Sequence, residues 1–89
     1  MHSFAWNPEK NQQLIAERGF SFEEILAVTE ARGVLDDVSN PSSRYPDQRM
    51  LIVDLNGYAV VVPYVQDGDV KFLKTAFYSR RATRLYREE

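Results

Sequence analysis

Two adjacent arginines, Arg80 and Arg81, lie in the stretch FYSRRATRLYREE, where a terminal helix is expected to begin near Ser79. The first turn of a helix is the positive end of its dipole, so cations there are unfavourable unless an anion joins them. Free backbone N–H groups, the helix dipole and two guanidinium groups would together hold one phosphate. The stretch therefore predicts an anion-binding site. A helix end salt-bridged to Asp47 or Glu88 is the alternative interpretation.

Four other residues are candidates for the same site. Lys74 comes shortly before the arginines on the preceding strand, and Arg49, at the start of the central strand, joins them if the sheet brings it alongside. Tyr64 and Tyr78 supply flat rings, which can stack on unpaired bases. Packing at the rim of the core is the alternative for both rings. The set predicts a site for the phosphates and bases of a nucleic acid.

Several other chemistries lack the residues they need. The chain has no cysteine, and its only histidine, His2, falls in an N-terminal stretch that we expect to be loose. Neither a thiolate metal site nor a serine nucleophile with a histidine base is therefore available. Asp36 and Asp37 have no further acid placed to complete a magnesium site, so a polar strand end is the preferred interpretation of that pair. We expect no metal and no cofactor.

The charges are segregated along the chain, although the net charge is only −2. Between residues 21 and 69, nine acidic residues face three arginines, whereas after residue 69 the balance is reversed. The basic residues of this last part are Lys71, Lys74, Arg80, Arg81, Arg84 and Arg87, against Glu88 and Glu89. Such segregation predicts a local basic patch on an acidic protein. An ordinary solvated charged face is the alternative.

Two helices are expected first among the elements that position these residues. The segment 7–9, with the sequence Asn-Pro-Glu, combines an N-cap, a proline suited to the first turn and an acid that complements the dipole. That helix runs to Arg18, and Gly19 supplies its left-handed end. Ser21 and Glu24 then form the S-x-x-E capping box of a second helix.

Strand patterns follow from residue 34. VLDDV is a plausible edge strand, and the polar stretch SNPSSRYPDQ is the longest loop. RMLIVDL, YAVVVPYV and VKFLKTAF are expected strands, joined by Asn-Gly and Asp-Gly turns, before the helix near residue 79. YAVVVPYV is apolar throughout, which suggests burial on both faces. The order predicts one α+β domain over residues 1–89: two N-terminal helices, a three- to four-stranded antiparallel sheet and a C-terminal helix, with the helices on one side of the sheet.

No stretch resembles a signal peptide or reaches transmembrane length, so a cytoplasmic location is expected.

The two ends of the chain carry motifs that resemble those of BrnT-type toxins. The opening FAWNPEKNQQLIAERGFSFEEILAV resembles the family's F-x-W-[DN]-x-x-K, helix and H-G-[VI]-S-F-E-E-A signature. The matching residues are Phe4, Trp6, Asn7, Lys10, Gly19, Ser21, Phe22, Glu23 and Glu24, with Arg18 where the family usually has His. The C-terminal motif I-S-A-R-[KR]-A-T-x-x-E-R-x-x-Y is matched by Arg80, Arg81, Ala82 and Thr83, with Tyr78 in place of its serine.

The resemblance implies a toxin of a bacterial type II toxin–antitoxin system with a RelE-like fold. Such proteins cleave RNA without a metal, by attack of a ribose 2′-OH on the adjacent phosphate, while cationic side chains stabilise the developing charge. The implied partner is an antitoxin with a ribbon-helix-helix DNA-binding domain, through which alone the operator DNA is contacted. A homodimer or a heterotetramer of two toxins and two antitoxins is compatible with this. The expected catalytic residues are Arg49, Arg80 and Arg81, and the expected RNA-binding residues are Lys74, Tyr64, Tyr78, Thr83 and Arg84.

Two departures from the family pattern concern proton transfer. Gln48 precedes Arg49 where the family commonly has an acid, and Pro63-Tyr64 stands where many members have a histidine. A tyrosine with a pKa of about 10 is a poor base near neutral pH. These departures keep open a second hypothesis, in which the same scaffold is a non-catalytic protein-interaction module.

Overall fold

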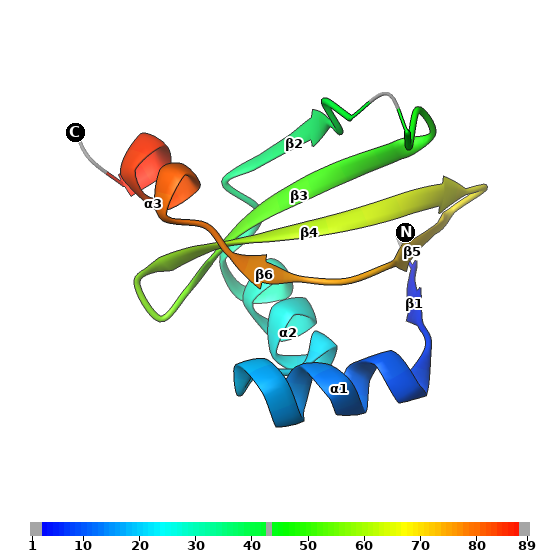
Figure 1. Cartoon of the computed structure of the whole chain (residues 1–89), viewed down its shortest axis with the longest axis horizontal. Coiled ribbons are helices and arrows are strands. Elements are labelled where there is room, and N and C mark those ends of the chain that lie inside the picture. Colours follow the sequence, from blue (N-terminus) through cyan, green and yellow to red (C-terminus); the bar gives the residue numbers. More distant parts are fainter. Residues whose placement is uncertain (1–2, 43, 88–89) are drawn as a thin grey trace.

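The chain forms one short strand, two helices, five further strands and a last helix in the part that the structure describes. The structure, a computed structural model, describes residues 3–42 and 44–87 (Figure 1). In chain order its elements are β1 (Ser3–Trp6), α1 (Pro8–Arg18), α2 (Phe22–Arg32), β2 (Asp36–Ser39), β3 (Gln48–Leu55), β4 (Tyr58–Asp67), β5 (Val70–Leu73), β6 (Phe77–Tyr78) and α3 (Arg80–Arg87). The α+β class is confirmed, as are the two early helices and the C-terminal helix.

The first two helices begin and end at the residues that the sequence indicates. The Asn7 side chain accepts a hydrogen bond from the backbone N–H of Glu9, and Gly19 closes α1 with a φ of 78°. The Ser21 hydroxyl accepts from the N–H of Glu24 at 3.1 Å, which caps α2. These caps satisfy backbone groups that would otherwise lack partners, so each helix is delimited by its own sequence.

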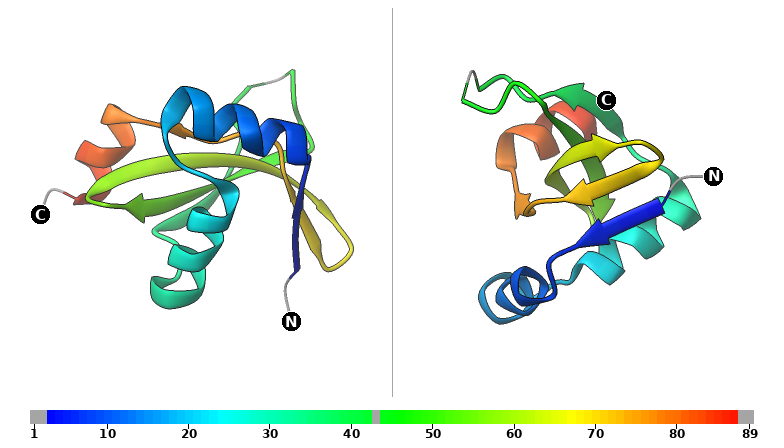
Figure 2. Two further views of the ribbon diagram at one scale, coloured as in Figure 1. Left: turned by 90° about the horizontal axis from the view of Figure 1, so that it is seen from below. Right: turned by 90° about the vertical axis from the view of Figure 1, so that its right-hand side faces the viewer.

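The sheet is larger than predicted, and it is mixed. Its strand order is β1-β5-β4-β3-β2, with β6 also paired to β4. The expected antiparallel strands are present, because β2, β3, β4 and β5 pair in that order. The expectation was incomplete, because β1 adds a parallel strand next to β5 and β6 adds a short antiparallel one next to β4. Figure 2 shows β1 running alongside β5, at the opposite end of the long axis from α3. The four residues of β1 carry little signal of their own, and their pairing depends on a strand near the other end of the chain.

The expected last strand is divided into β5 and β6. The register runs from Tyr64 opposite Leu73 to Val60 opposite Tyr78, so one extra residue is accommodated between the two strands. Pro63 has no N–H to donate, and it lies at this interruption, where its carbonyl accepts from the N–H of Lys74 at 2.8 Å. This bulge-like break is where a proline within a strand is tolerated.

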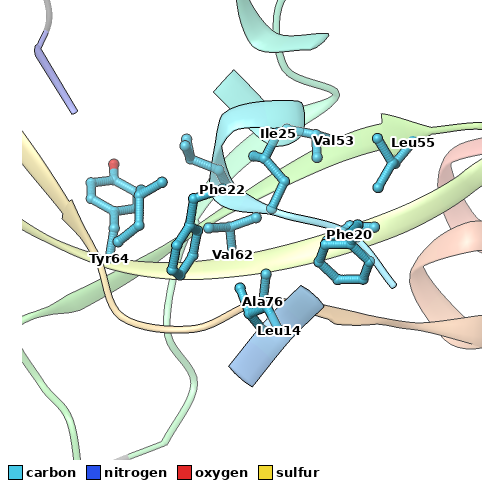
Figure 3. Packing of buried hydrophobic residues seen from close by; sticks show 12 residues of the cluster. Leu14, Phe20, Phe22, Ile25, Val53, Leu55, Val62, Tyr64 and Ala76 are labelled. Carbon is cyan, nitrogen blue, oxygen red and sulfur yellow. The ribbon is translucent and has the colours of Figure 1, made fainter. Parts of the chain in front are cut away.

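Both faces of the central strands are covered by helices, which corrects the expectation of helices on one side. On one face, buried side chains of α1 and α2 pack against β3 and β4 in the main core (Figure 3). This core includes Leu14, Phe20, Phe22, Ile25, Leu51, Val53, Leu55, Val60, Val62 and Tyr64. On the other face, Ala82 of α3 packs against Ile52, Ala59 and Val61. The continuous apolar run of β4 requires this arrangement, because successive residues point to opposite faces.

The turn between β3 and β4 is the tight hairpin that Asn-Gly predicts. Asn56 and Gly57 both have positive φ, at 54° and 93°, as a type I′ turn demands.

None of the helices in the described part of the chain is long and apolar enough to span a membrane.

Candidate functional site

The residues that the sequence analysis assigns to a single site lie on two opposite faces of the sheet. Arg49 and Tyr64 are paired across β3 and β4 and share the face covered by α1 and α2. Tyr78 lies on the same face, because its ring packs edge-on against the buried ring of Phe20 at 5.1 Å. The arginines of α3 lie on the opposite face, which we call the α3 face. The expectation that Arg49 reaches the region of Arg80 and Arg81 is therefore not met.

A carboxylate that the sequence analysis treated as a polar strand end organises the first group. Asp37 of β2 accepts hydrogen bonds from the Tyr64 hydroxyl, which lies 2.8 Å from each of its carboxylate oxygens. Nε of Arg49 lies 3.2 Å from Oδ1 of the same carboxylate, and Nη2 donates to the Asp37 backbone carbonyl at 2.9 Å. We call these three residues the Asp37 cluster. It joins β2, β3 and β4 through side chains as well as through the ladder.

The environment of the Asp37 cluster determines its chemistry. Burial raises the pKa of Tyr64, and the hydrogen bond to Asp37 raises this pKa further, against a smaller opposing effect of Arg49. The pKa of Arg49 is raised by its interactions with Tyr64 and Asp37. Tyr64 thus remains a protonated donor at neutral pH. Its ring is only 1% exposed, which leaves no free face for a stacking base.

Local hydrogen bonds fix the position of α3. The Ser79 hydroxyl accepts from the N–H of Ala82 at 3.0 Å, which confirms Ser79 as the cap. The Thr83 hydroxyl donates to the Ser79 carbonyl at 2.7 Å and accepts from the N–H of Ala59 at 2.9 Å. Ala82 is buried against the sheet, so Arg80, Arg81 and Arg84 are turned toward solvent. The predicted RNA-binding residue Thr83 is thereby engaged within the protein.

The exposed side of α3 carries concentrated positive charge. Arg80, Arg81 and Arg84 are spaced as neighbours on one side of the helix, where like charges repel. Across residues 3–42 and 44–87 none of the three has an ion-pair partner. The alternative partner Asp47 does not bind them, and Glu88 lies outside the described residues. A bound polyanion would relieve both the mutual repulsion and the unfavourable position against the helix dipole.

A second aspartate anchors the far end of α3. The Tyr86 hydroxyl donates to Oδ2 of Asp36 at 2.7 Å. This bond lowers the pKa of Asp36, as does the bond that its carboxylate accepts from the N–H of Asp37. The same contact raises the pKa of Tyr86. Neighbouring aspartates of β2 therefore hold one tyrosine on each face of the sheet. Within the described chain, no group of three or more His, Cys, Asp or Glu residues is placed to hold a metal.

The α3 face also contains a pocket of about 470 Å³ beyond the helix, bounded by the β2–β3 connection and the break between β5 and β6. Its lining consists of Asn40, Pro41, Tyr45, Gln48, Met50, Pro63, Lys74, Thr75 and Phe77. Sequence reasoning placed Lys74 near the site but missed Tyr45 and Phe77. Successive side chains of β4 point to opposite faces of the sheet, and Val61 points to the α3 face. Phe77 pairs with Val61, so the same alternation would have placed Phe77 on the α3 face.

A larger pocket, of about 600 Å³, lies on the opposite face beside α2. Its charged lining residues are Glu30, Asp37 and Lys71. Arg49 is paired with Asp37, which leaves Glu30 against Lys71 in this pocket. The pocket therefore has no excess of positive charge to attract a phosphate. The α3 face is therefore the better candidate for a polyanion.

No protein family, curated protein or solved structure that was compared with this chain matches it. The fold and site define an α+β protein in which a cationic helix and an aromatic-lined pocket share one face of a mixed sheet.

Proposed function

We propose that this chain is a toxin-like protein that acts on RNA through its α3 face. The observation that carries the proposal is the set of three exposed arginines on α3 without ion-pair partners in the described chain. Lys74 adds a fourth cation on the same face. A phosphate backbone offers the repeated negative charges that such a row of cations attracts.

Single-stranded RNA suits this face better than a duplex. The α3 face also exposes the aromatic rings of Tyr45 and Phe77, which line a pocket together with Lys74. Unpaired bases stack on such rings, whereas the bases of a duplex are already stacked. The combination of cations and aromatic rings therefore supports a ligand with both phosphates and accessible bases.

The proposal includes metal-independent cleavage of that RNA. The 2′-OH of a ribose attacks the adjacent phosphate, the bond from phosphorus to the 5′-oxygen breaks, and the products are a 2′,3′-cyclic phosphate and a 5′-hydroxyl. Water takes up the proton of the 2′-OH and supplies one to the 5′-oxygen, while Arg80 and Arg81 stabilise the charge that develops on the phosphate oxygens. In this proposal Arg49 and Tyr64 contribute through the stability of the sheet, because both bind Asp37. The resemblance of the two terminal motifs to those of BrnT-type toxins supports the reaction class.

The same motifs support a partner. We propose a ribbon-helix-helix antitoxin that neutralises the chain in the bacterial cytoplasm and links it to operator DNA. The surplus of cations on α3 favours an acidic segment of the antitoxin as the part that competes with RNA. Assembly as a homodimer, or with two antitoxin chains around two toxins, belongs to this proposal.

A second candidate function is a non-catalytic interaction module. The specific observation in its favour is that Tyr64, the residue at the position where many BrnT-type toxins have a histidine, is buried and bonded to Asp37. In this case the arginines of α3 receive the carboxylates of a partner protein, and RNA is not cleaved.

Inducible expression in a bacterium separates the two candidates. The wild-type chain should arrest growth and generate RNA fragments that end in a cyclic phosphate, and a double Arg80→Gln, Arg81→Gln variant should do neither. Arg32→Gln is the matched control, because Arg32 is an exposed arginine of α2 that is paired with Asp54. Growth arrest that persists in the double variant contradicts a site on α3. Arrest without RNA fragments favours the interaction module.

A further inference from the structure

We propose that the pocket between the β2–β3 connection and the β5–β6 break binds one unpaired nucleobase of the RNA, with the adjacent phosphate at Lys74. This inference rests on the proposed function and assigns it a base-binding subsite, hereafter the base pocket. Its volume of about 470 Å³ falls within the range of small-molecule sites, which are mostly apolar with a few polar groups.

Two aromatic side chains of the base pocket are exposed. Tyr45 is 48% exposed and Phe77 is 38% exposed, although large apolar side chains gain stability from burial. They come from separate parts of the chain, the β2–β3 connection and β6, and line the same pocket with Met50 and Pro63. A planar base inserted there would cover apolar surface that the folded chain leaves open. Stacking of this kind is tolerant of base identity, because every base has a π-face.

The polar groups of the pocket match the edge of a base. The Asn40 amide donates to the side-chain oxygen of Gln48 at 3.3 Å, and its own oxygen accepts from the N–H of Ser42. This arrangement orients both amides. The side-chain nitrogen of Gln48 donates to no acceptor in the described part of the chain, so it is available to a ligand. Amide side chains are typical partners of base edges.

Lys74 supplies the phosphate contact at the rim. Its ammonium group lies 5.2 Å from the centre of the Phe72 ring, and the side chain is exposed. Arg80 comes six positions after Lys74, a separation that spans at most roughly 20 Å of extended chain. One short single strand can therefore place a base in the pocket and further phosphates on α3.

The charge of the lining favours a nucleotide over a peptide segment with basic groups. None of the lining residues of the base pocket is acidic, whereas the larger pocket beside α2 contains Glu30 and Asp37. An ammonium group without an opposing carboxylate attracts a phosphate and repels a basic peptide. The base pocket therefore suits a base joined to a phosphate better than the larger pocket beside α2 does.

Fluorescence titration with a short RNA that contains 2-aminopurine tests the inference on the full chain. Stacking should quench the 2-aminopurine, and a matched RNA with abasic sites should bind more weakly. Tyr45→Ala should weaken binding of the base-containing RNA about fivefold to a hundredfold, the effect of losing one stacked base, and leave the abasic RNA unchanged. Tyr58→Ala is the control, because Tyr58 is also highly exposed but contacts Tyr78 on the opposite face.

The outcomes separate this inference from the proposed function. Equal binding of both RNAs by the wild-type chain, without quenching, overturns the base pocket and leaves RNA binding by the cations intact. If neither RNA binds, the proposed function fails and the subsite fails with it. Equal losses from Tyr45→Ala and Tyr58→Ala also overturn the subsite. If Tyr45→Ala instead weakens binding of a co-expressed partner protein and spares RNA, the pocket is a protein-docking site and the inference is wrong.

Discussion

The phenolic hydroxyl of Tyr64 lies 2.8 Å from each carboxylate oxygen of Asp37. The bond spans from β4 to β2, across the strand that carries Arg49, and Arg49 binds the same carboxylate. Because burial and Asp37 raise the pKa of Tyr64, its hydroxyl stays protonated at neutral pH and donates a hydrogen bond to Asp37. The Asp37 cluster therefore links β2, β3 and β4 through side chains, and Tyr64 is not poised to act as a general base.

Tyr64→Phe should destabilise the protein without affecting RNA binding. The change removes a hydrogen bond to a charged acceptor, for which the cost is about 1.5 kcal/mol in the free energy of unfolding, at the lower end of the usual range because Asp37 is partly exposed. Urea denaturation followed by Trp6 fluorescence gives this free energy. Tyr58→Phe, at an exposed tyrosine whose hydroxyl has no protein hydrogen bond in the described chain, should leave it unchanged. A loss of RNA affinity in Tyr64→Phe at unchanged stability would contradict the structural role.

The Asp36–Tyr86 contact should make the attachment of α3 dependent on pH. The pKa of Asp36 is lowered from its usual 3.8 in the folded protein. The contribution of Asp36 to stability is therefore fully present above pH 3.8, and it is lost as the pH falls through the lower pKa that Asp36 has in the folded protein. The pKa of Tyr86 is raised from its usual 10.0, so its contribution is present below that value and is lost as the pH rises through the folded pKa.

Thermal unfolding of the wild type and of Tyr86→Phe measures this dependence. The melting temperature of the variant should be lower at pH 7, and the difference should shrink as the pH falls through the lowered pKa of Asp36 in the folded protein. Tyr58→Phe should have the melting temperature of the wild type at every pH. A difference that is the same at pH 2 and pH 7 would contradict the ionised contact.

Local signals account for the parts of the fold that the sequence predicts. The caps at Asn7 and Ser21 and the turn at Asn56-Gly57 depend on residues within a few positions of one another, so they can be recognised without tertiary information. The pairing of β1 with β5 has no such local signal. The same applies to the place of α3 on the second face, which depends on Ala82 fitting against β3 and β4.

The candidate site was predictable only in part, for a similar reason. The cationic stretch at Arg80 and Arg81 and its cap at Ser79 follow from the local sequence. The prediction that Arg49 lies near the arginines of α3 failed. Successive strand residues point to opposite faces of the sheet, and the sequence does not indicate which of the two faces α3 covers. The role of Asp37 requires the register of three strands at once.

The salt dependence of RNA binding should depend on the arginines of α3. Each phosphate contact contributes about −0.7 to the slope of log K against log salt concentration for a single strand. Arg84→Gln should therefore reduce the magnitude of that slope by about 0.7, with weaker binding at low salt. Fluorescence titrations of one RNA at several salt concentrations give the slope. Arg32→Gln, on α2, should leave it unchanged, and an equal reduction there would indicate only a general effect of net charge.

Thr83 provides a direct test of whether a residue of α3 serves the fold or the ligand. Its hydroxyl accepts from the N–H of Ala59, a fully buried residue, and donates to the Ser79 carbonyl. Thr83→Val keeps the shape but leaves that N–H without an acceptor, which should lower the free energy of unfolding by about 1–3 kcal/mol. Thr83→Ser retains the hydroxyl and should lose less. Urea denaturation and RNA titration of both variants decide the point: if Thr83→Val is as stable as the wild type but binds RNA more weakly, the hydroxyl belongs to the RNA site and the attachment of α3 relies on Ala82 and Tyr86.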